Sequence, residues 1–165
     1  MVLMGIDPTE VRAGTAADPA AFAAGTLGFD RLGNIYRYVQ ADATGVTGLG
    51  YAVIMKPGQW IADMATSVVS APGIAQGAPV GFAQAAIAAN GYGWVLVCGR
   101  GSVFVATLCA RGTALTTTGT DGLLDDATTA GLEVVEGVSL EAANSGGASA
   151  LAAAYVNWPY IGRTL

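Results

Sequence analysis

The chain has 165 residues, of which 53% are apolar and only 12% are charged, and its formal net charge is −5. Its seven basic residues are scattered and form no stripe, which excludes recognition of nucleic acid through the phosphate backbone. The lack of histidine excludes Ser-His-Asp and Cys-His catalysis and histidine-ligated zinc sites.

The low charge is unusual for a monomer, because few polar groups remain to cover its surface. Either much of the surface is buried against other protein chains, or the sequence is simply rich in alanine and glycine. The chain contains no run of about 20 apolar residues that could span a membrane. Its N-terminus also lacks the basic and apolar regions of a secretory signal, so we expect a protein made in the cytoplasm with no membrane partner.

Residues 1–23 show no regular periodicity and contain two Asp-Pro steps, which favour extended or turn backbone before each proline. We interpret this segment as an N-terminal arm. Its apolar side chains, among them Ile6 and Phe22, would be wasted on a free tail. The arm therefore docks on a neighbouring chain or folds over its own domain, and the sequence leaves both arrangements open.

Residues 24–165 are predicted to form one all-β domain. The segment 35–40 alternates between two faces of a half-buried strand, with Ile35, Arg37 and Val39 opposite Tyr36, Tyr38 and Gln40. Residues 80–88 are ambiguous between helix and strand. Further strands are predicted within residues 51–56, 59–70, 93–99, 102–110, 114–127, 132–143 and 146–162. Turn signals recur every 8 to 12 residues, which is typical of a β-sandwich or barrel.

The glycine-rich stretch 90–112 is predicted to be a meander. Asn90-Gly91 is a strong hairpin signal, and Gly99-Arg100-Gly101 is predicted to be a second tight turn. A phosphate-binding loop is disfavoured there, because β-branched and aromatic residues follow where a helix would have to begin. At the tip of this turn Arg100 is either solvated or available to a carboxylate of a partner.

Both cysteines, Cys98 and Cys109, fall in the same stretch and would lie on neighbouring strands. Such cysteines could meet in a disulfide, but in a cytoplasmic product we expect two reduced, buried, small apolar side chains.

Three aspartates, Asp121, Asp125 and Asp126, form the main acidic cluster. Adjacent strand residues point to opposite faces, so Asp125 and Asp126 make a poor acid–base couple, and their spacing does not match a calcium loop. We predict an acidic turn, with no catalytic residue, no cofactor site and no metal site. A small hydrolase would need a carboxylate mechanism, and no pair of carboxylates is placed for one.

The three tryptophans have two possible roles. Trp60, Trp94 and Trp158 could form a sugar-binding platform, or they could pack in the core and at interfaces. Trp94 begins an apolar strand and is predicted to be core. Trp158, in "YVNWPYIG", is a candidate interface anchor, because large aromatic residues dominate the energetics of interfaces.

The order of segments resembles the small proteins of tailed bacteriophages that decorate or cement the capsid. After the arm come "GTLGFDRLGNIYRYVQA", a "GFAQ" strand, "YGWVLVCG", "TTTGTDGLLDD", "GVSLEAAN" and a terminal "NWPYIG", which together cover residues 24 to 162. The resemblance implies a compact jelly-roll or β-tulip-like fold. It also implies oligomerisation on the capsid exterior, with bridging of neighbouring major capsid subunits and no catalytic residues.

We therefore expect a non-enzymatic structural protein of a virion that stabilises the head, made in the host bacterium and located on the capsid exterior. Its expected partners are the major capsid protein and further copies of itself, as a trimer or a dimer, with no direct nucleic-acid contact. The alternative is a sugar-binding or host-adhesion module on a virion surface. The candidate interface residues are Ile6, Phe22, Trp60, Arg100, Trp158 and Tyr160.

Overall fold

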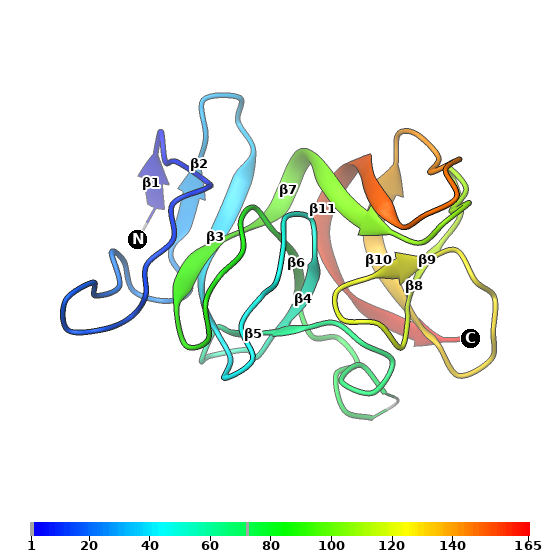
Figure 1. Cartoon of the computed structure of the whole chain (residues 1–165), viewed down its shortest axis with the longest axis horizontal. Helices are drawn as coiled ribbons and strands as arrows, with labels where there is room; N and C mark the ends of the chain where they lie inside the picture. The colour runs from blue at the N-terminus through cyan, green and yellow to red at the C-terminus, as the bar shows by residue number, and fades with distance from the viewer. Residues whose placement is uncertain (1, 72) are drawn as a thin grey trace.

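The structure, a computed structural model, describes residues 2–71 and 73–165, and in these residues it contains strands but no helix (Figure 1). The all-β prediction is therefore confirmed. Within the same residues there is also no helix of the length and apolarity that a membrane span requires. The described strands form one mixed sheet in the order β1-β2-β3-β5-β4-β6-β7-β11-β10-β8-β9.

The sheet closes on itself twice, and the long strand β7 belongs to both closures. The first ring runs β3-β5-β4-β6-β7 and closes where β3 pairs with β7. The second runs β7-β11-β10-β8-β9 and closes where Val105 pairs with Leu124. The first ring contains β3 (Ile35–Ala41), β4 (Ala52–Met55), β5 (Ile61–Met64), β6 (Val80–Ala83) and β7 (Tyr92–Val105). The second ring adds β8 (Leu115–Thr117), β9 (Leu124–Asp125), β10 (Glu133–Leu140) and β11 (Ala150–Thr164).

The predicted tight turn at Gly99-Arg100-Gly101 is wrong, because the single strand β7 continues through these residues. Its first half pairs with β3, and its second half pairs with β11, so the strand passes from one half of the molecule to the other (Figure 1). The glycines serve close packing instead of a turn. A Cβ at Gly99 would overlap the side chain of Asn34, and a Cβ at Gly101 would overlap that of Leu96.

Side chains alternate between two apolar clusters, as the period of a strand requires. Inside the first ring lies a cluster of mostly small or flexible side chains, which includes Val39, Ala41, Val53, Met55, Ala62, Met64, Ala83, Val95 and Val97. The opposite faces of the same strands carry Tyr36, Tyr38, Phe82, Trp94 and Leu96. These larger residues belong to a second cluster, which extends into the other ring and is therefore shared by both halves of the molecule.

The N-terminal segment lies against the first ring. Strand β1 (Val2–Met4) pairs in parallel with β2 (Leu27–Phe29), and β2 pairs with β3. Between β1 and β2, Arg12 forms a backbone bridge with Tyr92 at the start of β7. Of the two arrangements that the sequence leaves open, the structure has the one in which the arm folds over its own domain.

Several predicted elements are shorter in the structure than in the sequence patterns. Within residues 59–70 only β5 is a strand, and the ambiguous segment 80–88 contains strand β6 followed by a loop. The Asn90-Gly91 turn is present, because Gly91 N–H donates to the Ala88 carbonyl at 2.8 Å. The two cysteines do not lie on paired strands, since Cys98 is in β7 and Cys109 follows its end, and both thiols are free.

Candidate interaction surface

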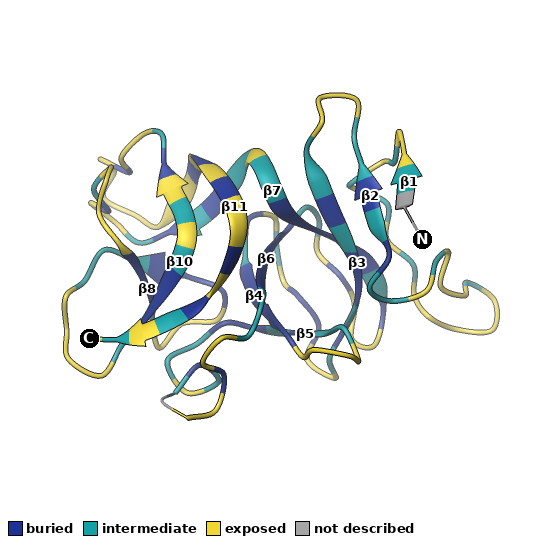
Figure 2. Cartoon of the chain, turned by 180° about the vertical axis from the view of Figure 1, so that it is seen from behind, coloured by how far each residue is buried: buried dark blue, intermediate teal, exposed yellow. Residues whose placement is uncertain are grey.

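The outward face of β11 carries a row of large apolar side chains. Along this strand small buried residues alternate with exposed ones, visible as dark and light bands in Figure 2. Four of the outward residues are between 44% and 49% exposed, namely Leu151, Tyr155, Trp158 and Tyr160. We call these four residues the β11 stripe. Because β7 and β10 hydrogen-bond to β11 on either side, the stripe stands on a rigid platform.

A bulge in β11 presents Trp158. Between the pairs Val138↔Val156 and Glu136↔Tyr160, β11 has three residues where β10 has only Gly137. Gly137 has a φ of 79°, and a Cβ there would lie 2.6 Å from the Asn157 carbonyl oxygen. A bulge re-aims side chains at an edge or site. Here a glycine on one strand and the insertion on the other together turn Trp158 outward.

The bulge borders a pocket of about 200 Å³, which we call the Arg37 pocket. Its wall comes from both rings: Arg37, Met55 and Val97 belong to the first, and the β11 bulge belongs to the second. The residues that line it include Arg37, Met55, Val97, Trp158, Pro159 and Tyr160. The pocket is thus continuous with the β11 stripe through Trp158 and Tyr160.

Arg37 is held in place from two sides. Its guanidinium carbon lies 4.0 Å from the centre of the Trp60 ring, and its NH1 group donates to the Gly25 carbonyl at 3.1 Å. Trp60 in turn packs directly on Gly25, where any Cβ would overlap the indole. A cation over an indole face is stabilised by about 0.5–2 kcal/mol, depending on how far it is desolvated. Trp60 therefore fixes the direction of the guanidinium.

The electrostatics of Arg37 are unusual for a half-buried cation. No carboxylate forms an ion pair with it among residues 2–71 and 73–165. Burial lowers the pKa of Arg37, and no acidic neighbour offsets this effect. The guanidinium stays protonated, because arginine is not deprotonated in proteins. The pocket therefore contains a positive charge that has lost water without gaining a counter-ion.

Both tryptophans at this place have strained backbone. Trp60 and Trp158 have φ values of 55° and 48°, and the described chain has only two other non-glycine residues with positive φ, Asn90 and Leu108. A left-handed conformation costs about 1–3 kcal/mol in a bulky residue and is concentrated at functional sites. Two such residues beside one cation mark this region as the strongest candidate site.

The six residues predicted for an interface fall into three places. Trp60, Trp158 and Tyr160 meet at or beside the Arg37 pocket. Phe22 instead packs into the core with its ring centre 5.4 Å from Tyr38 and 5.5 Å from Trp94. Ile6 also packs against the core.

Arg100 lies neither at the Arg37 pocket nor in the core. Its side chain is 76% exposed, and both Nε and NH2 contact Oε1 of Glu141, at 2.8 and 2.7 Å. Arg100 is therefore already paired within the chain, by a surface ion pair of small energetic weight.

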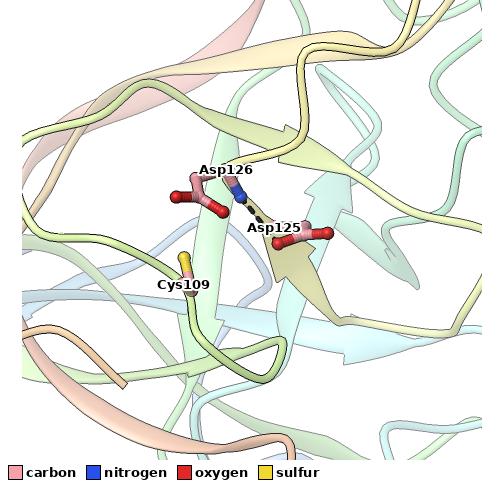
Figure 3. Close-up of side chains that lie close together, drawn as sticks. All are labelled: Cys109, Asp125 and Asp126. Carbon is pink, nitrogen blue, oxygen red and sulfur yellow. Dashed lines mark hydrogen bonds between the residues drawn. The ribbon is translucent and has the colours of Figure 1, made fainter. Parts of the chain in front are cut away.

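A second group of chemically interesting side chains lies in the other ring. Ligand atoms of Cys109, Asp125 and Asp126 lie within 4.8 Å of one another (Figure 3). Burial first, and then the nearby carboxylates of Asp126 and Asp125, raises the pKa of the Cys109 thiol to about 11. The Asp126 carboxylate accepts from Ala110 N–H at 2.9 Å. At neutral pH the thiol keeps its proton, and the Ala110–Asp126 hydrogen bond ties the loop after β7 to the segment that follows β9.

Arg37 is the site residue that the sequence patterns did not single out. A signal was present, because Arg37 shares its face of the strand with Ile35 and Val39. A charged residue on the apolar face of a predicted strand needs a partner or a function. The sequence named Trp60 and Trp158 as candidate platform or interface residues, but nothing in it indicated that Arg37 stacks on Trp60 and lines a pocket with Trp158.

Comparison with models of known protein families gives no match, and no curated protein is significantly similar to the chain.

Proposed function

We propose that this chain is a non-enzymatic structural protein of a phage virion, which attaches to the capsid exterior and bridges neighbouring major capsid subunits. The single observation that carries the proposal is the β11 stripe with its adjoining pocket. Exposed aromatic residues on a rigid sheet, next to a pocket, are typical of the hot spots of protein interfaces. The segment order of the sequence supports a decoration protein in particular.

The composition supports the same role. Because only 12% of the residues are charged, few charged groups surround the apolar side chains that the fold leaves exposed. Much of that area would be covered on a capsid or within an oligomer. We propose a homotrimer as the assembled form, with a dimer as the second possibility. Because a capsid presents many equivalent sites, several weak contacts per oligomer would add up to strong attachment.

Co-sedimentation with capsids tests the proposal. Purified chain would be mixed with particles assembled from a major capsid protein of the same genome and then pelleted through a sucrose cushion. We expect saturable binding at a fixed ratio of chain to capsid subunit. Absence of binding at micromolar chain concentration contradicts the proposal. Sedimentation equilibrium of the free chain and of chain released from particles tests the oligomer, and a monomer in both samples contradicts it.

A further inference from the structure

We propose that the Arg37 pocket receives the carboxylate of an Asp or Glu side chain from a partner protein, with the Arg37 guanidinium as its counter-ion. The identification of that partner as a capsid subunit rests on the proposed function. The proposal that the pocket binds a carboxylate does not rest on the proposed function, because it follows from the charge and shape of the pocket.

The first argument is the unsatisfied charge. A guanidinium has five N–H donors, and the described structure uses one of them, for the Gly25 carbonyl. The remaining donors include the pair that binds a carboxylate through two parallel hydrogen bonds. Stacking on Trp60 keeps the planar group in one orientation, so little side-chain entropy is lost when a ligand binds.

The second argument is the size of the pocket. Sites for drug-sized ligands measure roughly 300–1,000 Å³. At about 200 Å³ the Arg37 pocket is smaller and suits a single side chain. Trp158 and Pro159 line it together with Met55 and Val97, so the methylene groups of a glutamate would contact apolar surface while its carboxylate reaches Arg37.

The third argument concerns acidic sugars, which also carry a carboxylate. A sugar ring needs several hydrogen-bonding partners for its hydroxyl groups, because buried polar groups without partners are costly. Of the side chains that line the pocket, only Arg37, Trp158 and Tyr160 carry strong hydrogen-bonding groups. The chemistry of the wall therefore favours an amino-acid side chain over a sugar.

NMR titration of the full chain tests the inference with a defined probe. The probe is N-acetyl-glutamate α-amide, and the matched neutral probe is N-acetyl-glutamine α-amide. The signals to follow are the Arg37 Nε–H and the three tryptophan indole N–H groups. We expect the acidic probe to shift the Arg37, Trp60 and Trp158 signals with half-saturation on the order of 1 mM, as a single side chain allows. The neutral probe should cause no saturable shift.

Trp94 provides an internal control, because its side chain is buried in the core and only 1% exposed. Its indole signal should stay in place throughout the titration. Arg37→Gln should weaken binding at least tenfold, whereas Arg111→Gln, a change at an exposed arginine, should leave it unchanged. If Arg37→Gln does not fold, Trp158→Ala serves instead and should weaken binding at least twofold.

Three results would overturn the inference. The first is equal shifts from the acidic and the neutral probe. The second is binding of glucuronate at least tenfold tighter than the acidic probe, which would assign the pocket to acidic sugars. The third is a change of the Trp60 and Trp158 signals on simple dilution, which would assign it to a second copy of the chain. Each leaves capsid co-sedimentation as a separate test, so failure here and failure of the proposed function are distinguishable.

Discussion

The N-terminal arm and the last strand both carry large apolar side chains, but the structure uses them in opposite ways. Phe22 of the arm is turned inward, where it completes an aromatic cluster with Tyr38 and Trp94. Trp158 and Tyr155 of β11 are turned outward, although the strand itself is hydrogen-bonded on both sides. Aromatic content alone therefore does not mark a contact surface; what marks it is an aromatic residue that the chain's own core leaves uncovered.

The largest expected difference between these two regions is in stability. Phe22→Ala should lower the free energy of unfolding by about 2–3 kcal/mol, less than full burial would give, because Phe22 is only partly buried. Tyr155→Ala should change it by less than about 0.5 kcal/mol, as surface substitutions do. Urea unfolding of both variants measures the contrast. If Phe22→Ala lowered the free energy of unfolding as little as Tyr155→Ala does, the arm would not be part of the folded core.

The next effect concerns the bulge that presents Trp158. Gly137→Ala should destabilise the fold by about 1–3 kcal/mol, because the new Cβ meets the Asn157 carbonyl and the backbone must keep a positive φ. Gly147→Ala is the matched control, since a Cβ there has open space. Thermal unfolding compares the two. If both variants unfold at the same temperature, the bulge does not depend on glycine at position 137.

A smaller effect extends the comparison to the buried side of the second ring. In the folded chain the pKa of Cys109 rises to about 11 from an ordinary value near 9, so the unfolded chain loses this proton first. The stability that the neutral thiol provides is complete below about pH 9 and is lost as the pH rises towards 11. Unfolding of the wild type and of Cys109→Ala across this range should show the wild type losing stability faster. Parallel curves would contradict a closed environment at Cys109.

The smallest expected effect is spectroscopic. Trp158→Phe should leave stability nearly unchanged but remove much of the tryptophan fluorescence that acrylamide can quench, because Trp158 is 44% exposed and Trp94 is 1% exposed. Stern–Volmer plots of the wild type and the variant measure this. An unchanged quenching slope would mean that Trp158 is covered in solution, as it would be by a second copy of the chain.

Local patterns in the sequence predicted most strands but not how they join. The alternation in residues 35–41 and the apolar run in β7 follow from side-chain periodicity, which is a local property. The two ring closures depend on pairs far apart in sequence, such as Val105 with Leu124, and no local pattern encodes them. The false turn at Gly99-Arg100-Gly101 has in part the same origin, because Gly99 accommodates Asn34 from a distant part of the chain. Gly101 accommodates Leu96 of its own strand.

In the candidate site, too, local sequence patterns identified some residues, whereas others depend on contacts between distant parts of the chain. Trp158 and Tyr160 could be named from the sequence as large aromatics in a terminal segment, and the structure places both on the exposed stripe. For Phe22 the sequence could not choose between a neighbouring chain and its own core. Arg37 acquires its significance from Trp60 and the β11 bulge, which tertiary structure alone brings to it.

The central claim is that the β11 stripe attaches the chain to capsids, and one competition between two double variants tests it most directly. Tyr155→Ala/Trp158→Ala alters the stripe, whereas Leu32→Ala/Ile74→Ala removes two apolar side chains that are more exposed but lie in loops elsewhere. Both should fold like the wild type. Each variant, carrying its own fluorescent label, would compete with wild type for a limited number of capsids. The account predicts at least a tenfold loss of capsid occupancy for the stripe variant and none for the loop variant, and equal occupancy of the two would contradict it.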